Sequence, residues 1–231
     1  MPSTPTYALR YPANTDPPNV PLDMQNLATD IETKIAPGTA TGQIPVWDNT
    51  AKTWTGAQIG AGTTFPASPY DGQEYFYVAD ATNGIVWRFR YRAASASTYK
   101  WEFVGGSPLT AEIATAETMA GTATWTDLAT AGPLVALPRT GDYLIQWNAA
   151  CQCDTAGTIL YVAPLLVSAG PFTNDATDFH TAVAGTRSTV GKIIRRSFAS
   201  TGNVKLQYSS SAGGTLTFLK RNLTVWPIRV S

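Results

Sequence analysis

Few side chains in this sequence are suited to acid–base or nucleophilic chemistry. Its one histidine, His180, would have to serve any Ser/His/Asp or Cys/His site. It lies in the polar stretch 173–181, which predicts a loop and a solvated or interfacial imidazole. The sequence has neither a GxSxG turn nor a phosphate-binding loop. Glycosidases need only two carboxylates, so a polysaccharide hydrolase stays an alternative, but we expect no enzyme and no catalytic residues.

The two cysteines, Cys151 and Cys153, are too few for a structural zinc site, which needs about four Cys or His ligands. On one strand, residues two apart are separated by roughly 6.5–7 Å, which is too far for an unstrained disulfide. We therefore expect two small, buried thiols. The acidic stretch 174–178 comes nearest to a calcium loop, but it lacks the glycine turn and the distal glutamate. The sequence predicts neither a metal nor a cofactor.

Composition narrows the class of protein further. The chain has 231 residues, of which 44% are hydrophobic and 11% aromatic, so it has enough apolar surface to fold. Its 19 glycines and 16 prolines favour strands and turns over helices. Its 16 basic and 16 acidic side chains balance, which disfavours nucleic acid as a partner. No apolar run suits a membrane span, and the N-terminus does not resemble a signal peptide, so we expect synthesis in a cytoplasm.

An extended arm and a short helix are predicted for residues 1–36. Residues 1–20 are rich in proline. A helix is expected from about Pro21, because proline suits a first helical turn, to the break at Pro37-Gly38. One narrow stripe of apolar side chains follows at helical spacing: Met24, Leu27, Ile31 and Ile35. A helix of this length needs a partner, either the β-domain of the same chain or a multi-chain bundle.

A linker rich in glycine, threonine and alanine follows over residues 37–64. Within it, residues 48–50 form a turn sequence, and a tryptophan-containing segment flanks this turn on each side. The sequence therefore predicts a small hairpin with Trp47 and Trp54 on its two arms.

Residues 65–107 predict a β-meander. Aromatic and charged side chains alternate strictly along its segments, so one face should be apolar and the other charged. The apolar side consists of Ile85, Trp87, Phe89, Tyr91, Tyr99, Trp101 and Phe103. The arginines opposite suggest nucleic-acid binding, but acidic residues match the basic ones, which indicates a mixed, solvated face. The balanced residues are Arg88, Arg90, Arg92 and Lys100 against Asp71, Glu74, Asp80 and Glu102.

The largest block, residues 108–231, predicts an antiparallel jelly-roll β-sandwich from its short, regularly spaced strands and glycine-rich turns. Two of the expected strands are 215–220 and 223–230. Both cysteines share the apolar face of one long strand with Tyr143, Ile145 and Trp147. The run from Ile159 to Val167 is apolar almost throughout, so both faces should be buried, one in the sandwich and one against a second subunit. We expect a trimer interface at Leu160, Tyr161, Val162 and Leu165.

Parts of the chain resemble structural proteins of bacteriophage particles. The segments YALRYP and DPPNVPLDMQNLA, residues 7–12 and 16–28, are similar to the N-termini of minor tail and other structural proteins of actinobacterial siphophages. The block from Phe65 to Gly106, with DGQE, WRFRY and WEFVGG, resembles a module that recurs in those proteins. The predicted tryptophan hairpin also looks like phage fibre sequence.

The C-terminal block resembles the jelly rolls of the tumour-necrosis-factor and complement-C1q type. The resemblance rests on TGDY at residues 140–143, GNVKLQY at 202–208 and the closing strand LTVWPI at 223–228. Domains of that type form trimers and cap phage fibres and head spikes, so the resemblance implies a homotrimer.

Together these resemblances imply a non-enzymatic virion protein that binds other virion proteins through residues 1–36 and displays a trimeric β-sandwich. We expect a minor tail or tail-tip protein that contacts a host-surface glycan or protein. The alternatives are a capsid decoration or head-spike protein and a host cell-wall polysaccharide hydrolase. Aromatic side chains often recognise sugars, but most of the seven Trp, ten Tyr and eight Phe residues have core roles by alternation, and no sugar site is predicted.

Overall fold

Two units make up the chain, one ending at Gly60 and one running from Ala61 to Ser231. A computed structural model describes residues 20–34, 44–48, 53–57, 59–166, 170–171, 173–211 and 213–231. The predicted arm up to residue 19 and the helix stop at Pro37-Gly38 lie outside that part of the chain.

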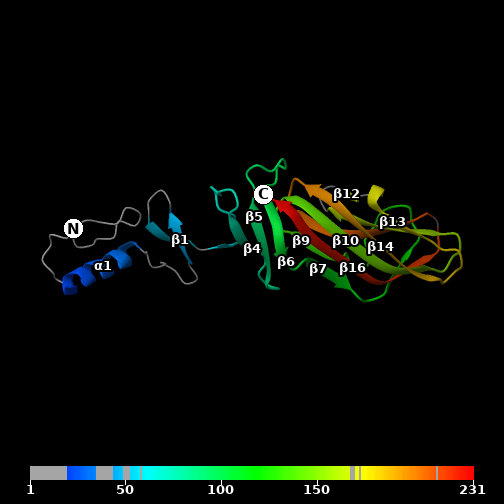
Figure 1. Ribbon diagram of the computed structural model, residues 1–231. Coiled ribbons are helices and arrows are strands. Elements are labelled where there is room, and N and C mark those ends of the chain that lie inside the picture. Colours follow the sequence, from blue (N-terminus) through cyan, green and yellow to red (C-terminus); the bar gives the residue numbers. More distant parts are fainter. Residues whose placement is uncertain are drawn as a thin grey trace. The chain divides into compact units, whose positions relative to one another are not determined.

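The first unit contains the predicted helix and the predicted hairpin (Figure 1). Helix α1 spans Val20–Lys34 and carries Asp23 in its first turn, where the helix dipole favours negative charge. Strands β1 (Ile44–Asp48) and β2 (Thr53–Ala57) pair antiparallel, with Trp47 opposite Trp54. Both predictions are confirmed. Within the described ranges, no helix has the length and apolarity to cross a membrane.

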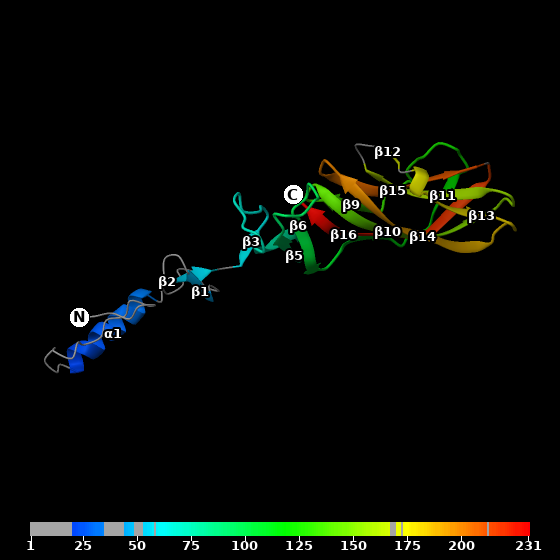
Figure 2. The same ribbon diagram turned by 45° about the horizontal axis from the view of Figure 1, so that its top comes forward.

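The second unit is a jelly-roll β-sandwich of two sheets, in which the long strands β10, β14 and β16 run side by side (Figures 1 and 2). This confirms the predicted mainly β fold class. The larger sheet has the order β14-β10-β16-β6-β5-β4-β3, and β7 and β8 also pair with β16. Its strands are β3 (Gly60–Gly62), β4 (Glu74–Asp80), β5 (Ile85–Tyr91), β6 (Trp101–Gly106), β7 (Leu109–Ile113), β8 (Glu117–Ala120), β10 (Gly141–Cys153), β14 (Arg187–Phe198) and β16 (Thr215–Val230).

The smaller sheet has the order β12-β11-β15-β9, and β13 pairs with β11. Its strands are β9 (Leu134–Leu137), β11 (Ile159–Leu166), β12 (Gly170–Pro171), β13 (Thr177–His180) and β15 (Gly202–Ser210). A short 3-10 helix, η1 (Thr173–Asp175), precedes β13.

Period-two alternation decides which side chains fill the space between the sheets. From the larger sheet, β10 contributes Tyr143, Ile145 and Trp147, all buried. From the smaller sheet, β15 contributes Val204, Leu206 and Tyr208, and β11 contributes Leu160, Val162 and Leu166. Burial of large apolar side chains on this scale is the main source of stability for such a fold.

The β-meander is part of the same sheet as the sandwich. β6 pairs with the end of β16 through Trp101 opposite Val230 and Glu102 opposite Arg229. The predicted boundary at residue 107 therefore falls within one continuous sheet. The apolar side of the meander is confirmed: Trp87 and Phe89 are fully buried, and the Phe65 ring stacks on Trp101 with centroids 4.4 Å apart.

The other side of the meander carries ion pairs. Glu74 lies 2.9 Å from Arg90 and 2.5 Å from Arg88, and these two guanidinium groups lower the pKa of Glu74. Glu102 lies 3.2 Å from Arg92 and 3.1 Å from Arg229. This confirms a mixed, solvated face, on which exposed pairs contribute little to stability.

The structure departs from prediction mainly in the second unit. The expected strands 215–220 and 223–230 are one strand, β16, with a bulge at Leu219, where the register with β10 shifts. The bulge changes the phase of the inward–outward alternation of side chains along β16, so Arg221 points into the core. In the sequence, the alternation of apolar and polar residues therefore looks interrupted. β7 and β8 were not predicted, because their burial is only partial and their apolar residues are few.

Candidate functional site

The histidine lies on a strand, and the prediction of a loop for its stretch is wrong. β13 pairs with β11, and His180 is its last residue. The His180 side chain is exposed in the single chain, as expected for a solvated or interfacial imidazole, with Nε2 3.0 Å from Asp178 Oδ2. Asp178 is exposed as well.

Cys151 and Cys153 point into the sandwich core from β10, are fully buried and are free thiols. The predicted small, buried thiols are confirmed. Burial raises the pKa of Cys151 to about 12, because the thiolate would lose its hydration. That thiol is therefore protonated and unreactive at neutral pH.

We expect Cys151→Ala together with Cys153→Ala to keep the fold and to lower the free energy of unfolding by roughly 1–3 kcal/mol, because buried packing is lost. Urea denaturation followed by tryptophan fluorescence measures the change. In the unsubstituted protein, alkylating reagents should reach neither thiol before unfolding. Rapid native-state alkylation, or bound zinc that disappears on substitution, would contradict this passive role.

The acidic stretch 174–178 divides its carboxylates between different partners. Asp175 pairs with Arg196 of β14, whereas Asp178 pairs with His180. Across the residues that the structure describes, no three His, Cys, Asp or Glu side chains are grouped so as to hold a metal ion.

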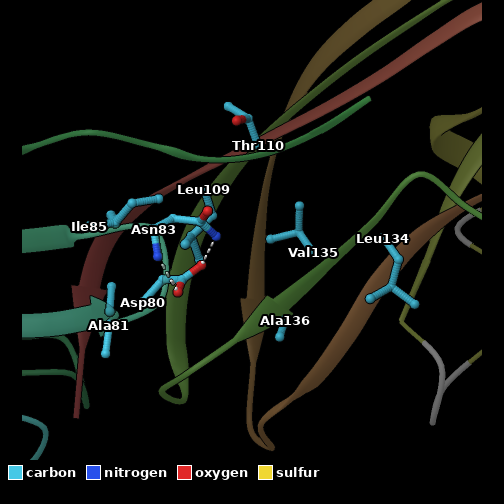
Figure 3. A pocket seen from close by; sticks show the side chains of 10 residues that line it. Asp80, Ala81, Asn83, Ile85, Leu109, Thr110, Leu134, Val135 and Ala136 are labelled. Carbon is cyan, nitrogen blue, oxygen red and sulfur yellow. Dashed lines mark hydrogen bonds between the residues drawn. The ribbon is translucent and has the colours of Figure 1, made fainter. Parts of the chain in front are cut away.

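A cavity of about 690 Å³ lies where the β4–β5 turn meets β7 and β9 (Figure 3). Its lining includes Leu109 and Val135. Asp80 accepts hydrogen bonds from Asn83 Nδ2 at 2.7 Å, from Asn83 N at 3.1 Å and from Thr82 N at 2.9 Å. These bonds, the Asn83 side chain first, lower the pKa of Asp80. The Asp80 carboxylate is therefore ionised, and its hydrogen bonds stabilise the β4–β5 turn.

A second hollow, of about 350 Å³, opens on the outer face of the smaller sheet. Three of its side chains form one row across neighbouring strands, because Tyr161 of β11 pairs with Ser209 of β15 on one side and with Asp178 of β13 on the other. Tyr161 points away from the core, since its neighbours Leu160 and Val162 are buried there.

Trp125, from the connection between β8 and β9, forms the wall beside this row. Its ring centroid lies 6.4 Å from that of Tyr161, with 54° between the ring planes. We name the site the aromatic groove, and its lining residues are Trp125, Tyr161, Thr173, Ala176, Asp178 and Ser209. The groove was not predicted, because Ser209 and Asp178 are distant from Tyr161 in sequence and lie beside it only through the pairing register of the three strands. The available signal was Trp125 itself, a lone tryptophan outside any strand pattern.

The connection that carries Trp125 is fixed to β15. Thr126 exchanges two backbone hydrogen bonds of 3.0 Å with Tyr208. Asp127 pairs with Lys205 Nζ at 2.5 Å. These two contacts with β15 hold Trp125 beside the groove.

A buried arginine fixes the same connection from inside. Arg221 is fully buried, with Nη1 3.1 Å from Glu117 Oε2, and Nη2 donates to the Thr115 carbonyl at 3.2 Å. Glu117 also accepts from Thr130 N at 3.2 Å. Burial raises the pKa of Glu117, but the hydrogen bonds from Thr130 and Arg221 outweigh it and lower that pKa overall. This buried pair was not predicted from the sequence.

The four residues predicted at a trimer interface do not lie on one surface. Leu160 and Val162 are fully buried in the sandwich core of the single chain, so they have no surface to offer a second subunit, and this part of the prediction is corrected. Leu165 and Ala163, on the side of β11 that faces away from the sandwich core, are also buried within the single chain. Burial of this side of the strand therefore needs no second subunit. Tyr161 is half-buried in the aromatic groove.

The helix stripe predicted to bind a partner is open where the structure describes it. Met24 is 67% exposed and Leu27 is 40% exposed. The side chain of Ile31 and the whole of Ile35 lie outside the described part of the chain. The choice between docking on the chain's own β-domain and a multi-chain bundle stays a prediction.

Comparison with solved structures finds similarity at low sequence identity and low TM-score. The tumour necrosis factor Eiger of S. frugiperda is 13% identical, with 54% of this chain and 95% of that chain covered and a TM-score of 0.38. The globular domain of zebrafish complement 1qA is 8% identical, with 54% and 98% covered and a TM-score of 0.35. Infectious bursal disease virus, Gx strain, is 13% identical, with 61% of this chain but only 38% of that chain covered and a TM-score of 0.35. No family model matches the chain, and no curated protein matches it. These likenesses concern the fold alone.

Proposed function

We propose that this chain is a non-enzymatic structural protein of a bacteriophage virion, attached by its first unit and displaying the sandwich at the tail or tail tip toward the host surface. The observation that supports this most is the open apolar side of α1, on which Met24 and Leu27 are exposed. The phage-like segments at residues 7–12 and 16–28 lie in the same unit. Exposed apolar side chains on a short helix call for a partner surface.

Burial of the helix stripe supplies the free energy for attachment. At about 25 cal/mol per Å² of apolar area, a few such side chains contribute several kcal/mol per chain. In an oligomer, the second and third helices bind at high effective concentration, so attachment is strengthened by avidity.

Deletion of residues 1–36 should abolish incorporation into virions, because the docking helix is lost, while the sandwich stays folded. Immunoblotting of purified particles measures incorporation. The double variant Met24→Asp/Leu27→Asp should have the same effect in the full-length chain. Gln25→Glu/Thr29→Glu, on the other side of the helix, is the matched control and should be incorporated normally. Normal incorporation of the deletion protein would show that the anchor lies elsewhere.

Imaging of particles that carry a gold label on the sandwich separates the placements. A label at the tail supports the proposed role, whereas a label on the head favours the capsid decoration or head-spike alternative. Release of reducing sugars from host envelopes by the purified protein would contradict the non-enzymatic role and favour the hydrolase.

The proposed homotrimer is assigned to the outward face of the larger sheet. On this face Ile193 of β14 is 58% exposed and lies opposite Gln146 of β10. Leu144, also exposed, lies opposite Trp226 of β16. An open sheet face with these apolar side chains favours self-association. The number of subunits comes from the resemblance of residues 108–231 to trimeric jelly rolls.

Ile193→Glu should convert the trimer into folded monomers, because each interface would then bury an unpaired charge. Multi-angle light scattering on the eluting protein gives the mass, and thermal unfolding confirms the fold. Val183→Glu is the matched control, because Val183 is exposed in the connection before β14, and it should stay trimeric. A monomeric unsubstituted protein at micromolar concentration would contradict the assembly.

A further inference from the structure

The aromatic groove combines groups that neither the core nor the proposed attachment uses. We propose that it binds a neutral saccharide, with a sugar ring against Tyr161 and Trp125 and the sugar hydroxyls on Asp178. The proposal rests on the proposed function for the source of the saccharide, a host-surface glycan. Binding itself depends only on the groove.

The two aromatic rings are not explained by core packing. The hydrophobic core cluster contains Tyr143, Trp147 and Tyr208 but neither Trp125 nor Tyr161. Both rings are half-buried, and the 54° between their planes makes an angled wall instead of a closed stack. The C–H face of a pyranose packs well on such rings, because it is apolar and meets the negative face of the π-system.

Polar groups stand beside the rings in the same row of the sheet. Asp178 is 55% exposed and faces the groove from β13. A carboxylate can accept about four hydrogen bonds, so its contact with His180 leaves capacity for sugar hydroxyls. Hydrogen bonds to an ionised acceptor are the stronger kind. Ser209 and Thr173 add hydroxyl groups to the lining, which suits a ligand that is itself rich in hydroxyls.

Charge and size restrict the class of saccharide. Asp178 places a negative charge at the groove, and like charges at short range repel, which disfavours sialylated, uronic or phosphorylated glycans. The nearby Arg196 does not reverse this, because its guanidinium is already paired with Asp175. The volume of about 350 Å³ lies at the lower end of the roughly 300–1,000 Å³ of ligand pockets. One or two sugar rings fit that space.

The groove is also formed before a ligand arrives. The backbone pairing of Thr126 with Tyr208 and the ion pair of Asp127 with Lys205 hold the Trp125 connection against β15. Tyr161, Ser209 and Asp178 are held by strand pairing. Little ordering is then needed on binding, which preserves affinity.

Saturation-transfer NMR on the full-length protein tests the proposal with maltotriose, cellotriose and tri-N-acetylchitotriose as neutral probes and 3′-sialyllactose as an anionic one. At least one neutral trisaccharide should receive saturation at its ring C–H protons. Asp178→Asn should weaken that binding about tenfold, as expected for loss of a charged hydrogen bond. Tyr161→Ala should abolish it. The matched controls Glu112→Gln and Tyr70→Ala, at exposed positions outside the groove, should bind like the unsubstituted protein.

The result that overturns the proposal is absence of saturation with every neutral probe, stronger binding of the sialylated probe, or binding that survives Asp178→Asn unchanged. Asp178 is exposed, so this variant should fold even if Tyr161→Ala does not, and thermal unfolding verifies it. Particle incorporation separates the two proposals. If the protein binds the sugar but is absent from virions, only the proposed virion role is contradicted. If it is incorporated into virions but binds no sugar, only the proposed saccharide site is contradicted.

Discussion

Leu160→Asp should leave the second unit unfolded. Leu160 is fully buried between the sheets, where a carboxylate has neither water nor a cation as partner. The free energy of burying such a group exceeds about 5 kcal/mol, on the order of the whole stability of a domain. We expect loss of near-ultraviolet circular dichroism, loss of a cooperative thermal transition and accumulation of insoluble protein.

The neighbouring residue provides the control for this experiment. Tyr161 points to the aromatic groove, so Tyr161→Asp should stay soluble and unfold cooperatively, at a modestly lower temperature. Two adjacent positions of one strand should thus respond differently to aspartate, one by unfolding and one by staying folded, because successive side chains face opposite sides of a sheet. A folded Leu160→Asp protein would mean that β11 is shifted by one residue relative to the register described above.

Arg221→Met should lower the free energy of unfolding by about 3 kcal/mol, because removal of one partner of a buried ion pair leaves the other without compensation. Glu117 would keep its hydrogen bond from Thr130 but lose the guanidinium. Urea denaturation at pH 7 measures the effect. Addition of Glu117→Gln should recover part of the loss, since no charge is then left unpaired.

Arg229→Met is the matched control for the buried arginine. Arg229 pairs with Glu102 at 3.1 Å, but both side chains are about one-third exposed, so its loss should cost less than about 1 kcal/mol. Equal effects of the two substitutions would indicate that Arg221 stabilises the fold through its carbon chain and not through its charge. The same conclusion would follow if the losses in unfolding free energy caused by Arg221→Met and by Glu117→Gln simply added in the double variant.

Local pattern was enough to predict the parts of the fold whose partners lie nearby in sequence. The tryptophan hairpin, the aromatic side of the meander and the inward-facing cysteines all follow from turn residues and period-two alternation. The same reasoning failed at Leu219, where a bulge reverses the phase of β16. It also failed at β13, whose short polar sequence becomes a strand only because β11 offers an edge to pair with.

The candidate site was beyond prediction for a related reason. Tyr161 was assigned to a subunit interface because the run from Ile159 to Val167 is apolar. Its actual neighbours, Ser209 and Asp178, are distant in sequence and are set by register across three strands. Trp125 reaches them from a connection without strand pattern. Sequence pattern shows which face a side chain takes, but not which residues lie beside it on the neighbouring strands.

The position of β16 in the sequence has a consequence for how the protein is made. β16 follows every strand with which it pairs, and those partners extend from β6 and β7 to β8 and β10. During synthesis, these strands leave the ribosome with an open edge that only Thr215–Val230 can close. Pairings so far apart in sequence are slow to form, and unpaired strand edges bind other chains. Slowing translation should therefore not help this protein to fold, whereas a chaperone that shields β10 until β16 emerges should raise its soluble yield.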